Sequence, residues 1–179
     1  MGKNCPIGLN ILVQSSGTVI HLTIQEEKIM ATNDTRQGTN FTAYESGFRK
    51  NWPAHAVEIP GLGKIPGKLF LKDVLGFTGC EISINSMAPG AGMPIYHQHQ
   101  QNEEVYIFIQ GKGQVQVDGE VIDVQEGSIV RIAPNGERIW RNNSNEPLLY
   151  IVIQTRERSL TQYGLADAIV PGKSVTWPN

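Results

Sequence analysis

Between residues 68 and 154 the chain is a series of short apolar runs, each ended by a turn signal, and few folds accommodate this pattern. Several runs alternate apolar and polar side chains, as half-buried strands do. Asp118-Gly119 is a strong signal for a tight hairpin, and the chain shows no helical period between the runs. This spacing predicts an all-β, antiparallel sandwich or barrel. The expected strands are 68–71, 80–87, 104–110, 114–117, 121–124, 128–133, 138–141 and 148–154.

The segments around these strands divide the chain into three parts. Residues 1–43 are expected to form an N-terminal extension, flexible where the sequence is polar and rich in turn formers at 32–40. Residues 44–170 are expected to form the β-barrel domain together with an irregular, aromatic-rich arm that packs on its core. Within them, Leu160–Val170 is a candidate for one short helix, and 171–179 are expected to be a C-terminal tail.

Length and charge exclude several classes of protein. The 179 residues suggest one domain with extra segments. The formal net charge is −2 and no long basic run is present, which argues against nucleic acid or an anionic membrane as the partner. No apolar stretch approaches the length of a membrane span. Cys5 and Cys80 give no disulfide framework, so a reducing, cytoplasmic location is expected.

The most informative polar cluster lies just before the strand at 104–110. His97 and His99 are two residues apart, so in an extended chain both imidazoles point to the same face. Glu103 and Glu104 follow after a short polar turn. Two imidazoles and one carboxylate form a nitrogen and oxygen ligand set that suits a divalent transition metal. The alternative is a solvated polar loop with histidines at its rim.

Two motifs in this region resemble those of the cupin superfamily. The first is written G-x5-H-x-H-x(3,4)-E-x6-G, and the second G-x5-P-x-G-x2-H-x3-N. The resemblance covers roughly residues 75–155 and selects Glu104 rather than Glu103, because only Glu104 precedes a glycine by the required six residues. It implies a small jelly-roll β-barrel with a metal in its interior. Matching positions are His97, His99, Glu104 and Gly111, with Ala91 in place of the first glycine, and then Gly127, Pro134, Gly136 and Asn143, with one extra residue before Pro134.

This alignment puts Ile139 at the position of the second-motif histidine. The resemblance therefore implies a metal site of His97, His99 and Glu104 without the fourth ligand, for iron, manganese, nickel or zinc. Two histidines and one carboxylate are also the ligands of non-haem iron(II) oxygenases, which leave positions open for substrate and O₂. The loss of the histidine leaves either a more open, reactive metal or a barrel with little metal affinity.

The strand period predicts the residues around this site. If Glu104 faces inward, Tyr106 and Phe108 do so too, and Ile139 would add to the same pocket wall. Gln154 is a further, weak oxygen donor. For Tyr106 and Phe108, plain core packing is an equally good interpretation.

The other face of the same strand is apolar as well. Val105, Ile107 and Ile109 lie there, and an exposed apolar sheet face would be a liability. Either the N-terminal arm or a second subunit should cover it. The latter possibility predicts a homodimer.

Three functions fit these features. A metal-dependent enzyme acting on a small organic molecule would be an oxygenase or dioxygenase first, and an isomerase or lyase second. A non-catalytic cupin would bind or sense a small molecule without turnover. A purely structural barrel would keep a vestigial site. The sequence offers no separate general base, so the catalytic residues stay unknown.

Overall fold

A computed structural model describes residues 11–15, 18–22 and 35–178, and the chain separates into two compact units, Met1–Thr32 and Asn33–Asn179. In the first unit, β1 (Ile11–Ser15) and β2 (Thr18–Leu22) form an antiparallel hairpin. Most of the expected N-terminal extension lies outside the described residues.

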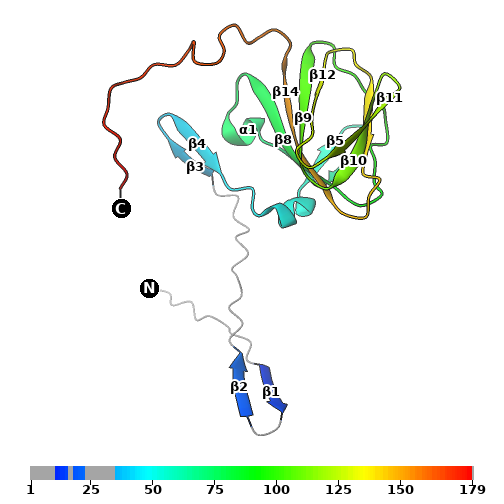
Figure 1. The fold of residues 1–179 in the computed structure, drawn as a ribbon, viewed down its shortest axis with the longest axis vertical. Helices are drawn as coiled ribbons and strands as arrows, with labels where there is room; N and C mark the ends of the chain where they lie inside the picture. Colours follow the sequence, from blue (N-terminus) through cyan, green and yellow to red (C-terminus); the bar gives the residue numbers. More distant parts are fainter. Residues whose placement is uncertain (1–10, 16–17, 23–34, 179) are drawn as a thin grey trace. The chain divides into compact units, whose positions relative to one another are not determined.

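The second unit contains the predicted barrel, built from two antiparallel sheets (Figure 1). One sheet has five strands in the order β12-β9-β14-β8-β7, and the other has three in the order β11-β10-β13. The all-β, jelly-roll prediction is confirmed. The strands are β7 (Lys68–Phe70), β8 (Cys80–Met87), β9 (Asn102–Gln110), β10 (Lys112–Val117), β11 (Glu120–Gln125), β12 (Ile129–Ile132), β13 (Arg138–Arg141) and β14 (Leu148–Arg156).

The core follows from the period-two alternation of these strands. Tyr106 and Phe108 of β9 are buried, and on the paired strand β14 they meet Tyr150 and Val152. Trp140 of β13 closes the same cluster, with its ring 5.2 Å from that of Tyr106. Full burial of each such apolar side chain stabilises the fold by about 1.5–3 kcal/mol.

The outer face of the five-stranded sheet is partly covered by the arm. Trp52, in the 3-10 helix η1 (Arg49–Ala54), packs against Ile84 and Leu149, and Ile109 joins this second cluster. The N-terminal arm therefore covers Ile109, which was one of the two ways expected for covering this apolar face; the other was a second subunit. The homodimer stays a prediction.

Two segments expected to be irregular form hairpins instead. β3 (Thr35–Gly38) pairs with β4 (Phe41–Tyr44), and β5 (Ala56–Ile59) pairs with β6 (Gly63–Pro66). A single turn of helix, α1 (Lys72–Leu75), ends at Gly76. Their apolar positions are too few and too close to glycine or proline for the sequence pattern to indicate strands.

The short helix considered for residues 160–170 does not form. The segment makes only isolated turns, with hydrogen bonds from the Ala166 N–H to the Tyr163 carbonyl and from the Ala168 N–H to the Leu165 carbonyl. Leu160 and Val170 are 74% and 90% exposed, so no packing stabilises a helix here. Gly164 also adopts a left-handed backbone conformation, with φ of 66°.

None of the helices in the described part of the chain is both long and apolar enough to cross a membrane.

Candidate metal and ligand site

A cavity of about 460 Å³ lies between the inner face of the five-stranded sheet and the β5–β6 hairpin. Polar groups gather in one region of it, and apolar side chains from the hairpin and from the loop after β8 line much of the rest. The polar groups include Lys68, Asn85, His97, His99, Glu104 and Gln154, and the apolar ones include Ile59, Leu62, Ile65, Met87, Met93 and Ile95.

The structure brings His97, His99 and Glu104 together. One potential ligand atom from each lies within 4.8 Å of the other two. Backbone hydrogen bonds hold the histidine segment against the loop before β13 and the strand itself: the His97 N–H donates to the Arg138 carbonyl at 3.2 Å, and the Asn135 N–H donates to the His99 carbonyl at 2.8 Å. Both imidazoles are half-buried while Gln98 between them is exposed, as the i, i+2 spacing requires.

The two glutamates have different surroundings. Glu104 is only 6% exposed and points into the barrel. Glu103 points the other way, where its carboxylate accepts a hydrogen bond from Arg131 Nε at 2.6 Å. Only Glu104 is therefore placed to bind a metal together with the two histidines.

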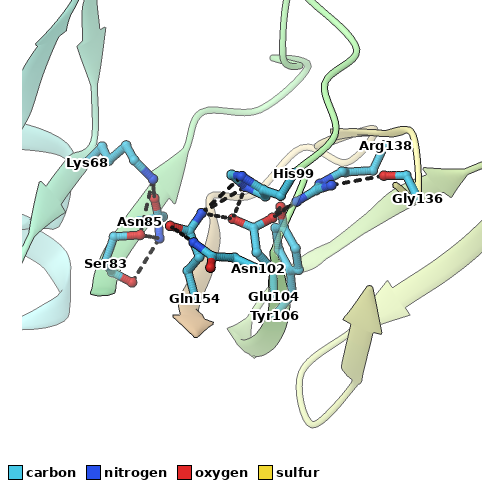
Figure 2. Close-up of polar contacts among 10 residues, drawn as sticks. All are labelled: Lys68, Ser83, Asn85, His99, Asn102, Glu104, Tyr106, Gly136, Arg138 and Gln154. Atoms are coloured by element: carbon cyan, nitrogen blue, oxygen red, sulfur yellow. Dashed lines mark hydrogen bonds and ion pairs between the residues drawn. The ribbon is translucent and has the colours of Figure 1, made fainter. Parts of the chain in front are cut away.

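Arg138 is the functional residue that the sequence interpretation missed. Its guanidinium is 0% exposed and donates twice to Glu104 Oε2, from Nη2 at 2.7 Å and from Nε at 3.2 Å. Arg138 Nη1 donates to the Gly136 carbonyl at 2.9 Å, and the Tyr106 hydroxyl donates to the same Glu104 oxygen at 2.8 Å (Figure 2). The buried carboxylate is thus paired with a cation supplied by the protein itself.

The remaining oxygen of Glu104, Oε1, faces the histidine side. His99 Nε2 lies 3.1 Å from it, and Gln154 Nε2 donates to it at 3.3 Å. Gln154 Nε2 also lies 2.8 Å from His99 Nε2 (Figure 2). Arg138 and Tyr106 therefore fix Oε2 of Glu104, while Oε1 is available to a metal bound by the histidines.

The surroundings shift the pKa values of Glu104, His97 and Tyr106. Burial alone would raise the pKa of Glu104, but hydrogen bonds from Arg138 and Tyr106 outweigh it and hold the pKa below its ordinary value. Burial, with the charge of Arg138, lowers the pKa of His97. Burial and the charge of Glu104 raise the pKa of Tyr106 well above its ordinary value, so its hydroxyl stays a donor. At neutral pH the site holds a carboxylate and a neutral His97 imidazole.

Ile139 lies elsewhere than expected. It pairs with Gln116 on the face of β13 that points away from the cavity, whereas Arg138 and Trp140 point inward. The prediction that Ile139 adds to the pocket wall is wrong, because a shift of one residue along a strand exchanges its faces.

Counting the second motif from Gly127 without an extra residue gives an alignment that agrees with the strand register, with Ala133 in place of the motif proline. Asn135 then takes the place of the motif glycine, and it has the left-handed φ of 67° that glycine usually supplies. Asn142 takes the place of the motif asparagine; it is 1% exposed and its amide donates to the Met87 and Glu146 carbonyls at 3.0 and 2.7 Å. Arg138 takes the place of the histidine. The uninterrupted spacing was the signal that could have identified it.

The other predicted pocket residues divide between cavity and core. Tyr106 and Gln154 line the cavity. Phe108 is buried in the core against Tyr150, with ring centres 5.7 Å apart, and does not line it. His55 forms a hydrogen bond with the Ser46 carbonyl at 3.1 Å and does not line the cavity.

A divalent metal fits His97, His99 and Glu104 Oε1. The donor set is the one transition metals prefer, and Oε1 keeps a lone pair for it. Arg138 cancels the charge of Glu104, so this site is less attractive to a cation than one with an unpaired carboxylate.

Comparison with known proteins agrees with this fold. The profile of the cupin domain family matches residues 84–154. A crystal structure of a cupin protein from Bacteroides fragilis is 43% identical, over 57% of this chain and 87% of that chain, with a TM-score of 0.56. The chain belongs to the cupin family.

More remote relatives add little on function. An uncharacterized protein of Methanocaldococcus jannaschii is 29% identical over 63 residues, which are 35% of this cupin and 50% of the relative. The chain thus spans about half the length of this curated relative. A predicted oxalate decarboxylase from Thermotoga maritima is 16% identical over 57% of this chain and 90% of that chain, with a TM-score of 0.49. That similarity has no bearing on activity.

Proposed function

We propose that this cupin binds a divalent metal through His97, His99 and Glu104 and acts on a small organic molecule held in the adjoining cavity. The observation that carries the proposal is the convergence of these three donors at the wall of a cavity large enough for such a molecule. When bound, the metal would supply Lewis-acid or redox chemistry.

The residues around the donors have distinct roles in this proposal. Arg138 and Tyr106 hold the Glu104 carboxylate in one orientation. A lowered pKa keeps His97 neutral, and therefore able to donate its lone pair, at neutral pH. Gln154 bridges His99 and Glu104 and positions both. The apolar side chains of the β5–β6 hairpin line the cavity beside these groups.

Within this proposal, a mononuclear non-haem oxygenase or dioxygenase is the enzyme class that the ligand set favours, since two histidines and one carboxylate leave positions open. An isomerase or lyase would use the same residues to polarise a carbonyl. Oxygen consumption in the iron-loaded protein, measured against a panel of diketones, thiols and aromatic diols, separates these classes. Turnover of none of them, together with tight metal binding, would count against the oxygenase.

A second candidate function is a cupin that binds a small molecule without turnover. The specific observation in its favour is Arg138, which neutralises Glu104 inside the barrel and so replaces part of the role of a metal. In this case the cavity would hold the ligand and the histidines would serve as hydrogen-bonding groups.

Metal titration discriminates the two. Protein stripped with a chelator is titrated calorimetrically with iron(II), manganese, nickel and zinc, and the metal content is checked by elemental analysis. We expect one metal per chain, lost in His99→Ala and retained in His55→Ala, which removes a histidine outside the cavity. Failure of all four metals to bind the wild type contradicts the metal-dependent function and leaves the second.

A further inference from the structure

Lys68 is a charged residue of the cavity that the metal site does not use. It opens β7 and pairs with Asn85 of β8, and its side chain lines the cavity. Its ammonium donates to Asn85 Oδ1 at 2.9 Å and to Ser83 Oγ at 3.1 Å (Figure 2). It also lies 4.6 Å from the centre of the Phe70 ring.

The two side chains that accept hydrogen bonds from Lys68 are buried and fixed in position. Ser83 and Asn85 are each 2% exposed. The amide nitrogen of Asn85 donates to the Ser83 carbonyl at 3.0 Å and to the Tyr150 carbonyl at 3.4 Å, which fixes its oxygen toward Lys68. These fixed acceptors therefore hold the Lys68 ammonium in one position.

The charge of Lys68 has no counter-ion in contact. Among the described residues, no carboxylate lies within 4.0 Å of its nitrogen, and both of its acceptors are neutral. An ammonium has three N–H donors, so one remains for a ligand. Burial lowers the pKa of Lys68 to about 8, at which the ammonium still predominates at neutral pH.

Apart from histidines, Lys68 and Glu104 are the charged residues that line the cavity. Glu104 is already paired with Arg138 at 2.7 Å. The carboxylates of Glu104 and Glu81 act on Lys68 without contact, so no ion pair within the described part of the chain compensates its charge. A buried cation without a partner is costly, and a ligand anion is the group that would compensate it.

We propose that Lys68, held by Ser83 and Asn85, is an anion-recognition site of the cavity and that the ligand is a small organic acid with an apolar body. Ile59, Leu62 and Ile65 of the β5–β6 hairpin provide the apolar wall for that body. The inference rests on the proposed function only in taking the cavity as the ligand site, and it does not require a metal.

The test compares two dyes with the same aromatic body, anilinonaphthalene sulfonate and the uncharged phenylnaphthylamine. Binding is measured by fluorescence titration at pH 7 in chelator-treated protein, with correct folding checked by circular dichroism. We expect Lys68→Met to bind the sulfonate at least about tenfold more weakly, since a hydrogen bond to a charged group is lost. Binding of phenylnaphthylamine should not change. Lys68→Gln, which keeps a polar group, should show the same selective loss.

Lys64→Met is the matched control, because Lys64 is an exposed lysine on β6, in the β5–β6 hairpin that lines the cavity. It should bind both dyes as the wild type does. The inference is overturned if Lys68→Met keeps its affinity for the sulfonate, loses both dyes equally, or is matched by Lys64→Met. Because these titrations contain no metal, failure of metal binding leaves them unaffected, and the two proposals fail separately.

Discussion

The buried pair of Arg138 and Glu104 gives the sharpest prediction. Replacing Arg138 by methionine keeps a long apolar side chain but removes two donors to Glu104 Oε2, at 2.7 and 3.2 Å. Glu104 is then a nearly buried carboxylate with hydrogen bonds from Tyr106 and Gln154 only. Its burial, now opposed by fewer donors, should raise its pKa.

Breaking a buried ion pair by removing one partner costs about 3–5 kcal/mol. The hydrogen bonds that Tyr106 and Gln154 still donate place Arg138→Met at the lower end, near 3 kcal/mol of lost unfolding free energy. Glu104→Gln should cost a comparable amount, because it leaves the fully buried guanidinium without a counter-ion. The double variant removes both charges, so its loss should be smaller than the sum by about 2 kcal/mol or more.

The assay is urea unfolding at pH 7 followed by tryptophan fluorescence, with the four proteins forming a double-mutant cycle. A second prediction on the same variant concerns pH. With its folded-state pKa raised, Glu104 in Arg138→Met destabilises the fold less as the pH falls, so the deficit against the wild type should shrink between pH 7 and pH 5. A loss below 1 kcal/mol in Arg138→Met, or strictly additive single losses, would refute the reasoning.

Three further predictions use other contacts. The pKa of Lys68 is about 8 in the folded protein, against an ordinary value of 10.5. Between pH 8 and pH 10.5 the unfolded chain therefore binds more protons than the folded one. The unfolding free energy of the wild type relative to Lys68→Met should rise by up to about 3 kcal/mol over this range and stay level below pH 8. Urea titrations of both proteins across this range check it, and a flat difference contradicts it. Asn135→Gly should leave the melting temperature nearly unchanged, whereas Asn135→Ala should lose about 1 kcal/mol at the left-handed position. Arg138→His removes a cation and adds an imidazole, so zinc affinity by calorimetry should rise at least about tenfold, and equal affinity would show that residue 138 does not influence the metal.

The sequence predicted the barrel strands well because their faces differ in polarity. Cys80–Met87, which alternates apolar and polar residues, has the predicted bounds, and so does Arg138–Arg141, which follows the Pro134-Asn135-Gly136 turn. The β5–β6 hairpin was missed, although it walls the cavity, because two four-residue strands among glycines and prolines carry little pattern. The Leu160–Val170 segment was overestimated for the opposite reason, since its apolar residues have nothing to pack against.

At the site, spacing to Gly111 selected Glu104, and the structure places that residue with His97 and His99. Arg138 was missed, although the uninterrupted spacing from Gly127 points to it. An alignment anchored on Pro134 and Gly136 put its neighbour in the motif position, and only the strand register shows which of the two side chains points inward. The contact between Lys68 and Asn85 could not be predicted from the sequence either, because the two residues are 17 positions apart and belong to no motif.

The protein-supplied cation at Glu104 also determines what the barrel requires in its interior. A buried carboxylate without a protein cation would need another partner, such as a bound metal, to balance its charge. Here Arg138 comes with the chain itself and is fully enclosed once β13 is in place. The charge of Glu104 is therefore balanced in the folded barrel without a bound metal.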